Sequence, residues 1–371
     1  MLVTSTLSSV KRLVLSGFYY PASSGIARAT VNLAIGLLEK GIHPAVTALY
    51  ISKRWINELE KFNIPTFSAF NSDCFEKVHY KLRLMWDLDY KLARKLNTQL
   101  KKLKDEFDLY VVSDDAALSL SKYKDEKRMI LWTHGEISML LLSSAWSRTY
   151  IRRLLSTLFV PVLLNHRKLV KNFDFIVANS NLAKELCQFT YEVIPRDIVY
   201  LPVNTQTFSP VNEPSNDYFI AVGRSDEGIG IILSELAKRI PLVTIGGLKV
   251  PNAKNLGFIS DDNMLRDLYS NAIATLHPAM GEYFGYPVAE SLACGTPVIA
   301  YDAGGPSELI SHGENGWLVK SNEDFYEIVM KIYKNGYSSA LRKNARESSN
   351  FFSIQKSTSK FIELITTFIG Q

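Results

Sequence analysis

Cysteine, long apolar runs and low-complexity sequence are all scarce in this chain of 371 residues. The three cysteines, Cys74, Cys187 and Cys294, are scattered and form no Cys-x-x-Cys pair, which argues against a disulfide framework or a thiolate metal site and favours a reducing compartment. The longest nearly apolar run, residues 154–164, contains Pro161 and is shorter than the ~20 residues that span a bilayer. The N-terminus lacks the positive charge that opens a secretory signal. We therefore expect a cytoplasmic protein that does not cross a membrane.

Apolar residues are plentiful enough to build ordered cores. The composition is 47% hydrophobic, 11% aromatic and 21% charged, which excludes a disordered or collagen-like protein. The length exceeds the ~100–200 residues of a common single domain. A stretch rich in Pro, Asn and Ser, residues 202–216, is typical of a linker. These features predict two domains, residues 1–204 and 205–352.

Short apolar runs alternate with segments of helical periodicity in both halves of the chain, which predicts mostly parallel sheets with helices on both faces. The expected strands are residues 11–17, 45–50, 66–70, 109–113, 129–133, 175–179 and 198–201, then 218–222, 242–245, 272–276 and 297–301. The expected helices include residues 25–40, 90–104, 231–239, 262–271, 287–293 and 306–311. Because ligands bind beyond the carboxyl ends of such strands, the loops that follow them should carry the chemistry.

The net charge of +5 is the sum of two unlike halves. Residues 1–204 hold 28 Lys+Arg against 19 Asp+Glu, a net of +9, whereas the remainder holds 14 against 18, a net of −4. An excess of this kind indicates a surface that meets anionic material, although scattered solvated lysines would give the same count. No recognisable nucleic-acid module accompanies the charge, so we expect no nucleic-acid partner.

Part of this positive charge lies in a segment without acidic residues, between Glu136 and Asp174. Basic and apolar side chains alternate there, a profile typical of a helix in a membrane interface or against an anionic lipid carrier. An ordinary helical insert packed on the first domain would show the same alternation. The residues that we single out as an acceptor or membrane surface are Trp146, Arg148, Arg152 and Arg153.

The most informative segment is residues 277–300. Glu282 lies in a glycine-flanked loop after a strand, Gly285 lets a ligand approach the backbone, and Pro287 suits the first turn of a helix whose free N–H groups favour anions. Glu290 follows one turn later and could accept hydrogen bonds from ribose hydroxyls, with Glu282 beside a sugar. Spacing alone leaves open that Glu290 complements the helix dipole and that Glu282 is solvated.

The same segment closely resembles the Glu-x7-Glu signature of retaining glycosyltransferases of family 4, which have the GT-B fold. Further segments resemble motifs of that family: residues 222–224, 245–247, 256–260, 304–308 and 313–319 in the second half, and 178–180 and 202–208 in the first. The resemblance implies two Rossmann-like doubly wound domains facing a cleft, with residues 353–371 packing back on the first.

The implied activity is retaining transfer of a sugar from a UDP- or GDP-linked donor to a glycan, lipid-linked or other acceptor, with neither cofactor nor metal ion. The resemblance does not indicate an oligomeric state. Glu290 would hold the ribose, and Glu282 would lie beside the transferred sugar. The other implied donor-site residues are Gly25, Gly223, Arg224, Phe258, Ile259, Tyr283, Phe284 and Gly285, and Arg224 would neutralise the phosphates. His134 matches a position where the family often carries an active-site histidine.

One departure concerns the lysine that the family usually places about five residues after the arginine. Ile229 stands there instead, and Asp226 and Glu227 bring negative charge. Lys249 or Arg28 could compensate for the missing cation. Otherwise the chain could be a degenerate sugar-nucleotide-binding protein, and a non-transferring sugar-nucleotide epimerase of the same fold is a further alternative.

Overall fold

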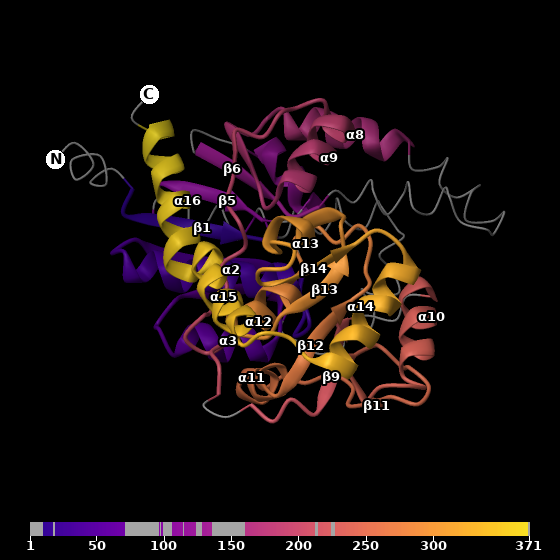
Figure 1. The fold of residues 1–371 in the computed structure, drawn as a ribbon. Coiled ribbons are helices and arrows are strands. Elements are labelled where there is room, and N and C mark those ends of the chain that lie inside the picture. Colours follow the sequence, from indigo (N-terminus) through magenta and orange to yellow (C-terminus); the bar gives the residue numbers. More distant parts are fainter. Residues whose placement is uncertain are drawn as a thin grey trace. The chain divides into compact units, whose positions relative to one another are not determined.

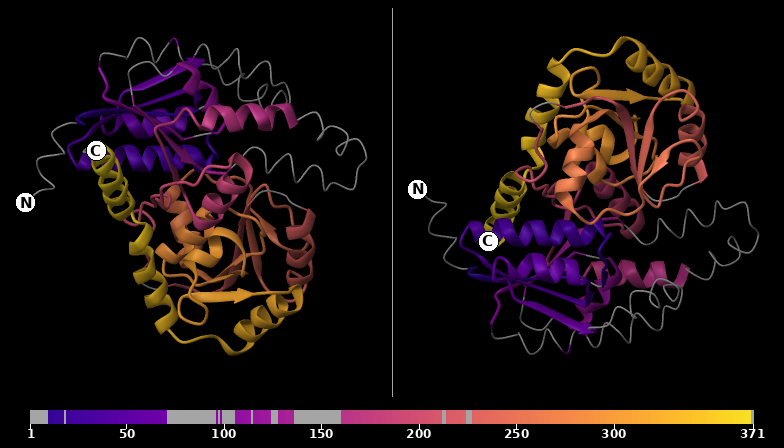
Figure 2. Two further views of the ribbon diagram at one scale, coloured as in Figure 1. Left: turned by 90° about the horizontal axis from the view of Figure 1, so that it is seen from above. Right: turned by 90° about the horizontal axis from the view of Figure 1, so that it is seen from below.

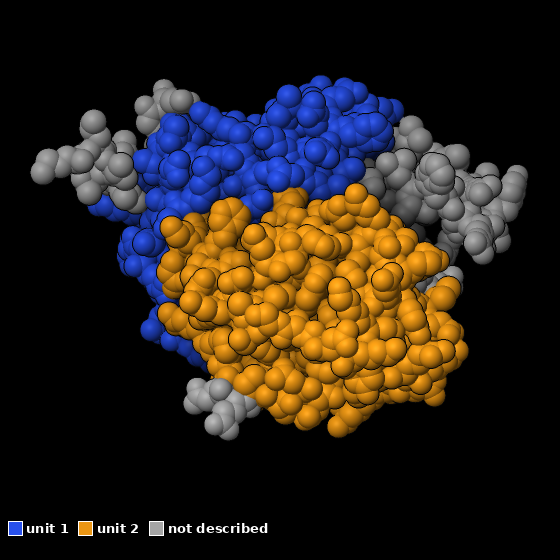
Figure 3. Space-filling model, in the orientation of Figure 1, with its two compact units in different colours: residues 1–200, 358–371 blue, residues 201–357 orange. Residues whose placement is uncertain are grey.

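The computed structural model describes residues 10–17, 19–70, 96, 98, 106–113, 115–123, 128–135, 160–211, 214–223 and 227–369. These residues form two compact units (Figure 3). Unit 1 comprises residues 1–200 and 358–371, and unit 2 comprises residues 201–357. Each unit is built around its own parallel sheet.

Eight described strands form the sheet of unit 1, in the order β2-β3-β1-β5-β6-β7-β8, with β4 beside β3 and every pair parallel. The strands are β1 (Arg12–Ser16), β2 (Tyr19–Tyr20), β3 (His43–Ile51), β4 (Thr66–Phe70), β5 (Leu109–Val112), β6 (Arg128–Thr133), β7 (Phe175–Ala178) and β8 (Asp197–Ile198). The central strands are short continuous apolar runs, because helices cover both of their faces.

Helices cover both faces of this sheet (Figures 1 and 2). They are α2 (Gly25–Glu39), α3 (Lys53–Glu60), η2 (Asp115–Tyr123), α8 (Val160–Val170), α9 (Asn181–Tyr191) and α16 (Ile354–Ile369), which unit 1 contains from Thr358 onward. On one face Val14 and Leu131 share a core with Leu169 of α8 and Cys187 of α9. On the other face Trp132 packs on Phe361 of α16, with ring centroids 6.1 Å apart.

Unit 2 repeats the doubly wound plan with six parallel strands in the order β11-β10-β9-β12-β13-β14. The strands are β9 (Tyr218–Gly223), β10 (Leu242–Gly246), β11 (Lys254–Asn255), β12 (Ala272–His277), β13 (Val298–Tyr301) and β14 (Gly316–Val319). The helices are α10 (Glu227–Leu236), α11 (Asp262–Ser270), α12 (Tyr286–Ala293), α13 (Gly304–Leu309), α14 (Asn322–Asn335), α15 (Ala340–Ser348) and η3 (Ser349–Phe352).

The main core of unit 2 lies between one face of the sheet and helices α10 and α14, where Leu233 and Phe325 meet Ala221 and Ile299 (Figure 1). Helix α12 covers the opposite face with α11 and α15 beside it. Arg346 of α15 donates to three backbone carbonyls and so links the segment of residues 205–208 to the end of α12. Its acceptors are Thr205 O, Phe208 O and Ala293 O, at 2.9, 2.9 and 2.8 Å.

These two doubly wound units confirm the predicted α/β fold class. Three short strands, β2, β11 and β14, were not predicted, and α10 begins at Glu227, four residues before the predicted start. The predicted helix over residues 90–104 lies outside the described residues, apart from positions 96 and 98.

The packing of α16 yields a first prediction. Phe361 is fully buried, whereas Phe351, ten residues earlier, is 64% exposed. Phe361→Ala should lower the free energy of unfolding by about 3–5 kcal/mol, because it leaves a cavity beside Trp132. The matched variant Phe351→Ala should change it by less than about 1 kcal/mol. Urea unfolding followed by tryptophan fluorescence measures both, and equal losses would contradict this account of the packing.

Candidate functional site

The carboxyl edge of the second sheet contains a topological switch point between β9 and β12. The chain leaves β9 toward β10 on one side, whereas β12 pairs with the other side of β9 and leads on to β13. The loops that follow Gly223 and His277 therefore diverge. In open α/β sheets such a divergence leaves the crevice in which ligands bind. The sheet of unit 1 also has a topological switch point, which lies between β1 and β5.

The loop between β12 and α12 is shaped by two glycines. Gly285 has φ +90° at the N-cap of α12 and supplies no side-chain cap, but its carbonyl oxygen accepts from Val288 N and Ala289 N at 3.0 and 3.1 Å. Gly305 N donates to Glu282 O at 2.8 Å, and a Cβ added to Gly305 would overlap the Tyr283 carbonyl oxygen. Glycine at position 305 thus lets the start of α13 pack directly on this loop. Phe284, 2% exposed, anchors the loop from within.

Glu290 lies on α12 and is 4% exposed. The Tyr269 hydroxyl donates to Glu290 Oε2 at 3.3 Å. A buried carboxylate requires hydrogen-bond partners because burial without them is costly. Glu290 is therefore a buried carboxylate with a hydrogen-bond partner and not a solvated one.

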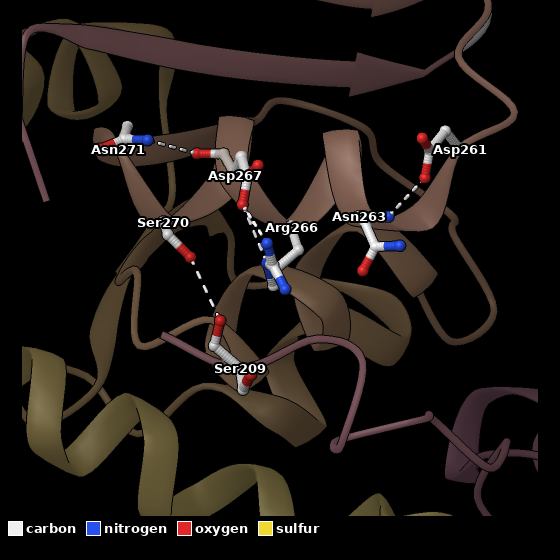
Figure 4. Close-up of polar contacts among 7 residues, drawn as sticks. All are labelled: Ser209, Asp261, Asn263, Arg266, Asp267, Ser270 and Asn271. Carbon is white, nitrogen blue, oxygen red and sulfur yellow. Dashed lines mark hydrogen bonds and ion pairs between the residues drawn. The ribbon is translucent and has the colours of Figure 1, made fainter. Parts of the chain in front are cut away.

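Helix α11, which carries Tyr269, is fixed at both ends by polar contacts (Figure 4). The Asp261 side chain accepts from Asn263 N at 2.8 Å at its start. At its end Ser270 Oγ donates to Ser209 O at 3.4 Å, and Asn271 Nδ2 donates to Asp267 O at 2.9 Å. These contacts fix α11 in the position from which Tyr269 reaches Glu290.

Three glycine-containing segments meet beside β9. Gly247 N donates to Gly223 O at 2.9 Å and Gly246 N donates to Gly257 O at 2.8 Å. Gly246 has φ +87°, and a Cβ there would overlap the Gly223 carbonyl oxygen. The structure thereby brings Gly223 and residues 257–259 to one edge of the sheet. Within this group Phe258 is 54% exposed and Ile259 is 8% exposed.

The predicted residues of unit 1 lie at the carboxyl edge of its sheet. Gly25 is exposed at the start of α2, where Ser24 Oγ caps the helix by accepting from Ala27 N. His134 directly follows β6, is 8% exposed, and has no hydrogen-bond partner at either ring nitrogen. Its ring lies 4.4 Å from that of Trp132 between centroids. Burial lowers the pKa of His134 to about 3, so the imidazole is neutral at physiological pH.

Sequence reasoning assigned no role to His277, the last residue of β12. It is 5% exposed, its Nε2 has no hydrogen-bond partner, and burial lowers its pKa to about 4. The signal that could have found it is a polar residue at the carboxyl end of an otherwise apolar strand beside the switch point.

Several predicted residues lie outside the described part of the chain: Arg224, Trp146, Arg148, Arg152 and Arg153. Ile229, at the place of the missing lysine, packs against the core of unit 2. Lys249 is exposed in the loop after β10. Among the described residues, no group of three His, Cys, Asp or Glu side chains could hold a metal ion, and no helix is long and apolar enough to cross a membrane.

Two cavities in unit 2 are lined by residues outside the Glu282–Glu290 segment. One of about 320 Å³ is lined by Pro210, Cys294 and Arg342, and one of about 400 Å³ lies by Tyr218 and Leu242, where β9 and β10 begin. Arg342 donates to Ser270 O and Gly295 O, at 3.2 and 3.3 Å, so it holds backbone together in the first cavity.

Part of the second unit is similar to a known protein family. Residues 248–348, which include Glu282 and Glu290, match the family model described as "Glycosyl transferases group 1". The "GDP-Man:Man(3)GlcNAc(2)-PP-Dol alpha-1,2-mannosyltransferase" of Dictyostelium discoideum is 23% identical over 290 residues, which are 71% of this chain and 55% of that protein. The chain thus spans about half the length of this relative.

Solved structures are similar along almost the whole chain. Sucrose-phosphate synthase from Thermosynechococcus elongatus is 17% identical, with a TM-score of 0.74 and coverage of 97% of this chain and 99% of that one. Anabaena HepE in complex with UDP is also 17% identical, with a TM-score of 0.71 and coverage of 96% and 100%. The fold is GT-B. This confirms the fold that the sequence resemblance implied.

The two buried histidines give a prediction about pH. Their pKa values are lowered in the folded state, so below pH 6.5 the unfolded state binds protons that the folded state does not, and stability falls as pH falls. Between pH 6.5 and pH 5 each of the two histidines should lower the free energy of unfolding by about 2 kcal/mol. The double variant His134→Gln/His277→Gln should show a shallower decline than the wild type in urea unfolding. His43→Gln, at an exposed position, is the control, and identical slopes in all three proteins would refute the assignment.

Proposed function

We propose that this protein is a retaining glycosyltransferase that moves a sugar from a nucleotide-diphosphate donor to a glycan, lipid-linked or other acceptor without a metal ion. The observation that carries the proposal is the buried Glu290 carboxylate on α12, hydrogen-bonded to Tyr269 beside the switch point of unit 2. A fixed carboxylate of this kind can accept two vicinal ribose hydroxyls. The family match over residues 248–348 includes this position.

The donor would lie along the carboxyl edge of unit 2. Glu290 would bind the ribose, Phe258 and Ile259 would border the base, and Glu282 would lie beside the transferred sugar. Backbone N–H groups of Tyr283, Phe284 and Gly285 would meet sugar hydroxyls, with Gly25 and Gly223 near the phosphates. UDP and GDP are the nucleotides to consider, since one structural neighbour is a UDP complex and the Dictyostelium relative is named for GDP-Man.

Arg224 would stabilise the negative charge that develops on the leaving phosphate as the glycosidic bond breaks. The partly buried Ile229 packs against the core and has no charge to offer a phosphate, so we assign the second cation to exposed Lys249. Arg28 is a poorer choice because its guanidinium lies over the Trp55 ring, 5.8 Å from the centroid. If the wild-type protein bound the donor without turning it over, the alternative of a degenerate sugar-nucleotide-binding protein would be favoured instead.

His134 would bind substrate and not abstract a proton. A histidine with a pKa of about 3 is a weak base at neutral pH, far from the match between pKa and operating pH that general-base catalysis favours. Retention then follows if the acceptor hydroxyl attacks from the side of the leaving group and the departing phosphate takes its proton. In this step His134 would bind substrate through its neutral ring nitrogens.

The acceptor would bind to the basic first half of the chain. A lipid-linked acceptor is supported by the PP-Dol in the name of the Dictyostelium relative and by the alternation of basic and apolar residues around Arg152 and Arg153. The same residues would attach the protein to the inner face of an anionic membrane.

Removing the Glu290 carboxylate should affect mainly nucleotide binding, whereas removing the Glu282 carboxylate should affect mainly turnover. Glu290→Ala should weaken nucleotide binding about 10- to 100-fold, because it removes a hydrogen-bonding charge worth about 1.5–3 kcal/mol. Glu282→Ala should lower kcat about 100-fold or more with a smaller change in nucleotide affinity. Glu327→Ala, at an exposed position of α14, is the control.

Transfer and hydrolysis are assayed with UDP- and GDP-linked sugars, and nucleotide affinity is measured by calorimetry. Nucleotide binding without any turnover by the wild type would contradict the enzyme proposal. Interconversion of the free donor would favour the epimerase.

Membrane association has its own test. The variant Arg152→Glu/Arg153→Glu should reduce sedimentation with vesicles of anionic lipid several-fold, because each basic residue near such a surface contributes about 1 kcal/mol. Neutral vesicles serve as the control. Unchanged binding of the variant to anionic vesicles would exclude this surface as the docking site.

A further inference from the structure

His277 combines a central position with an unsatisfied polar atom. It ends β12 beside the switch point, and its backbone pairs with Ala300 of β13. The side chain is 95% buried, and Nε2 has neither solvent contact nor a hydrogen-bond partner. Buried polar atoms in native proteins are nearly always paired, so an exception in this place calls for a functional reason.

The face on which His277 lies follows from strand geometry. Side chains two residues apart in a strand share a face, so His277 lies on the same face as Thr275. Thr275 Oγ1 hydrogen-bonds Ser291 Oγ of α12 at 2.7 Å, which identifies this face as the one that α12 covers. His277 is one step nearer the carboxyl edge, where α12 begins. It therefore lies beneath the loop of residues 278–285 and the uncapped first turn of that helix.

An unpaired buried nitrogen such as His277 Nε2 costs free energy. A rearrangement of the overlying loop that gives Nε2 a partner would recover this free energy. If the rearranged loop is also the form that binds the donor, the recovered free energy appears as donor affinity, since a ligand favours whichever state it binds better. The neutral form of the imidazole suits this role, because it can pair with a backbone group without an added charge.

We propose that His277 is a positioning residue of the donor site, whose Nε2 gains a hydrogen bond from the 278–285 loop only when the nucleotide is bound. This inference rests on the proposed function, because the ligand is the nucleotide part of the sugar donor. It assigns His277 no contact with the reacting atoms. It predicts that stability and nucleotide affinity respond to the same substitution with opposite signs.

The test compares His277→Leu, His277→Asn and the wild type in full-length protein. Leucine fills much of the same volume with no polar atom to leave unpaired, so the urea midpoint of the ligand-free protein should stay the same or rise. The dissociation constant for UDP or GDP, whichever binds the wild type more tightly, should increase about tenfold by calorimetry. His277→Asn, which keeps a hydrogen-bonding group, should recover part of that affinity. His312→Leu, at an exposed histidine of the same unit, should leave the dissociation constant unchanged.

The outcomes separate the inference from the function on which it rests. An unchanged dissociation constant for His277→Leu, with the wild type binding nucleotide, would overturn the positioning role and leave the proposed function in place. Parallel losses of stability and affinity would also overturn it, because a purely structural residue behaves in that way. Failure of the wild type to bind either nucleotide would overturn both.

Discussion

The parallel pairing of β9 with both β10 and β12 is the constraint on which the site depends. It places the carboxyl ends of three strands at one edge, from which the connecting loops leave in opposite directions. The loop contacts at this edge are made between backbones: Gly247 N to Gly223 O, Gly246 N to Gly257 O, and Gly305 N to Glu282 O. Larger side chains at Gly246 or Gly305 would overlap neighbouring carbonyl oxygens and force these loops apart.

In the proposed function, local dipoles help to recognise the donor, because the net charge of this part of the chain does not favour an anion. Residues 205–371 carry a formal charge of −4, whereas a nucleoside diphosphate is itself negative. At the N-terminus of α12 the positive end of the helix dipole favours an anion without a net positive charge. In our proposal Arg224 and Lys249 add the only side-chain cations assigned to the phosphates. This arrangement confines the attraction to one end of the sheet.

The sequence allowed the fold class and the strand, loop and helix that contain Glu282 and Glu290 to be predicted, because alternating apolar runs and a glycine-rich strand-to-helix turn are local signals. Strands of two residues such as β2 and β11 were missed, since their pairing is decided by neighbouring strands and not by their own residues. β14 was missed because Gly316–Val319 was interpreted only as part of a motif.

The burial and contacts of individual side chains depend on tertiary packing, so they could not be predicted from the sequence. The burial of Glu290 required Tyr269, which is 21 positions away in the chain. The core position of Ile229 likewise depends on how α10 packs. His277 attracted no attention because a single histidine at the end of an apolar strand is usually a structural residue, and its unpaired Nε2 could be seen only in the structure.

The central claim is that the carboxyl edge of unit 2 binds a nucleoside diphosphate, and hydrogen–deuterium exchange with and without UDP or GDP tests it most directly. The account predicts slower exchange in residues 256–260 and 282–290 when the nucleotide is present, because these segments carry the ribose, base and sugar contacts. Unchanged exchange in both segments at saturating nucleotide, or protection confined to the cavity beside Cys294 and Arg342, would contradict it.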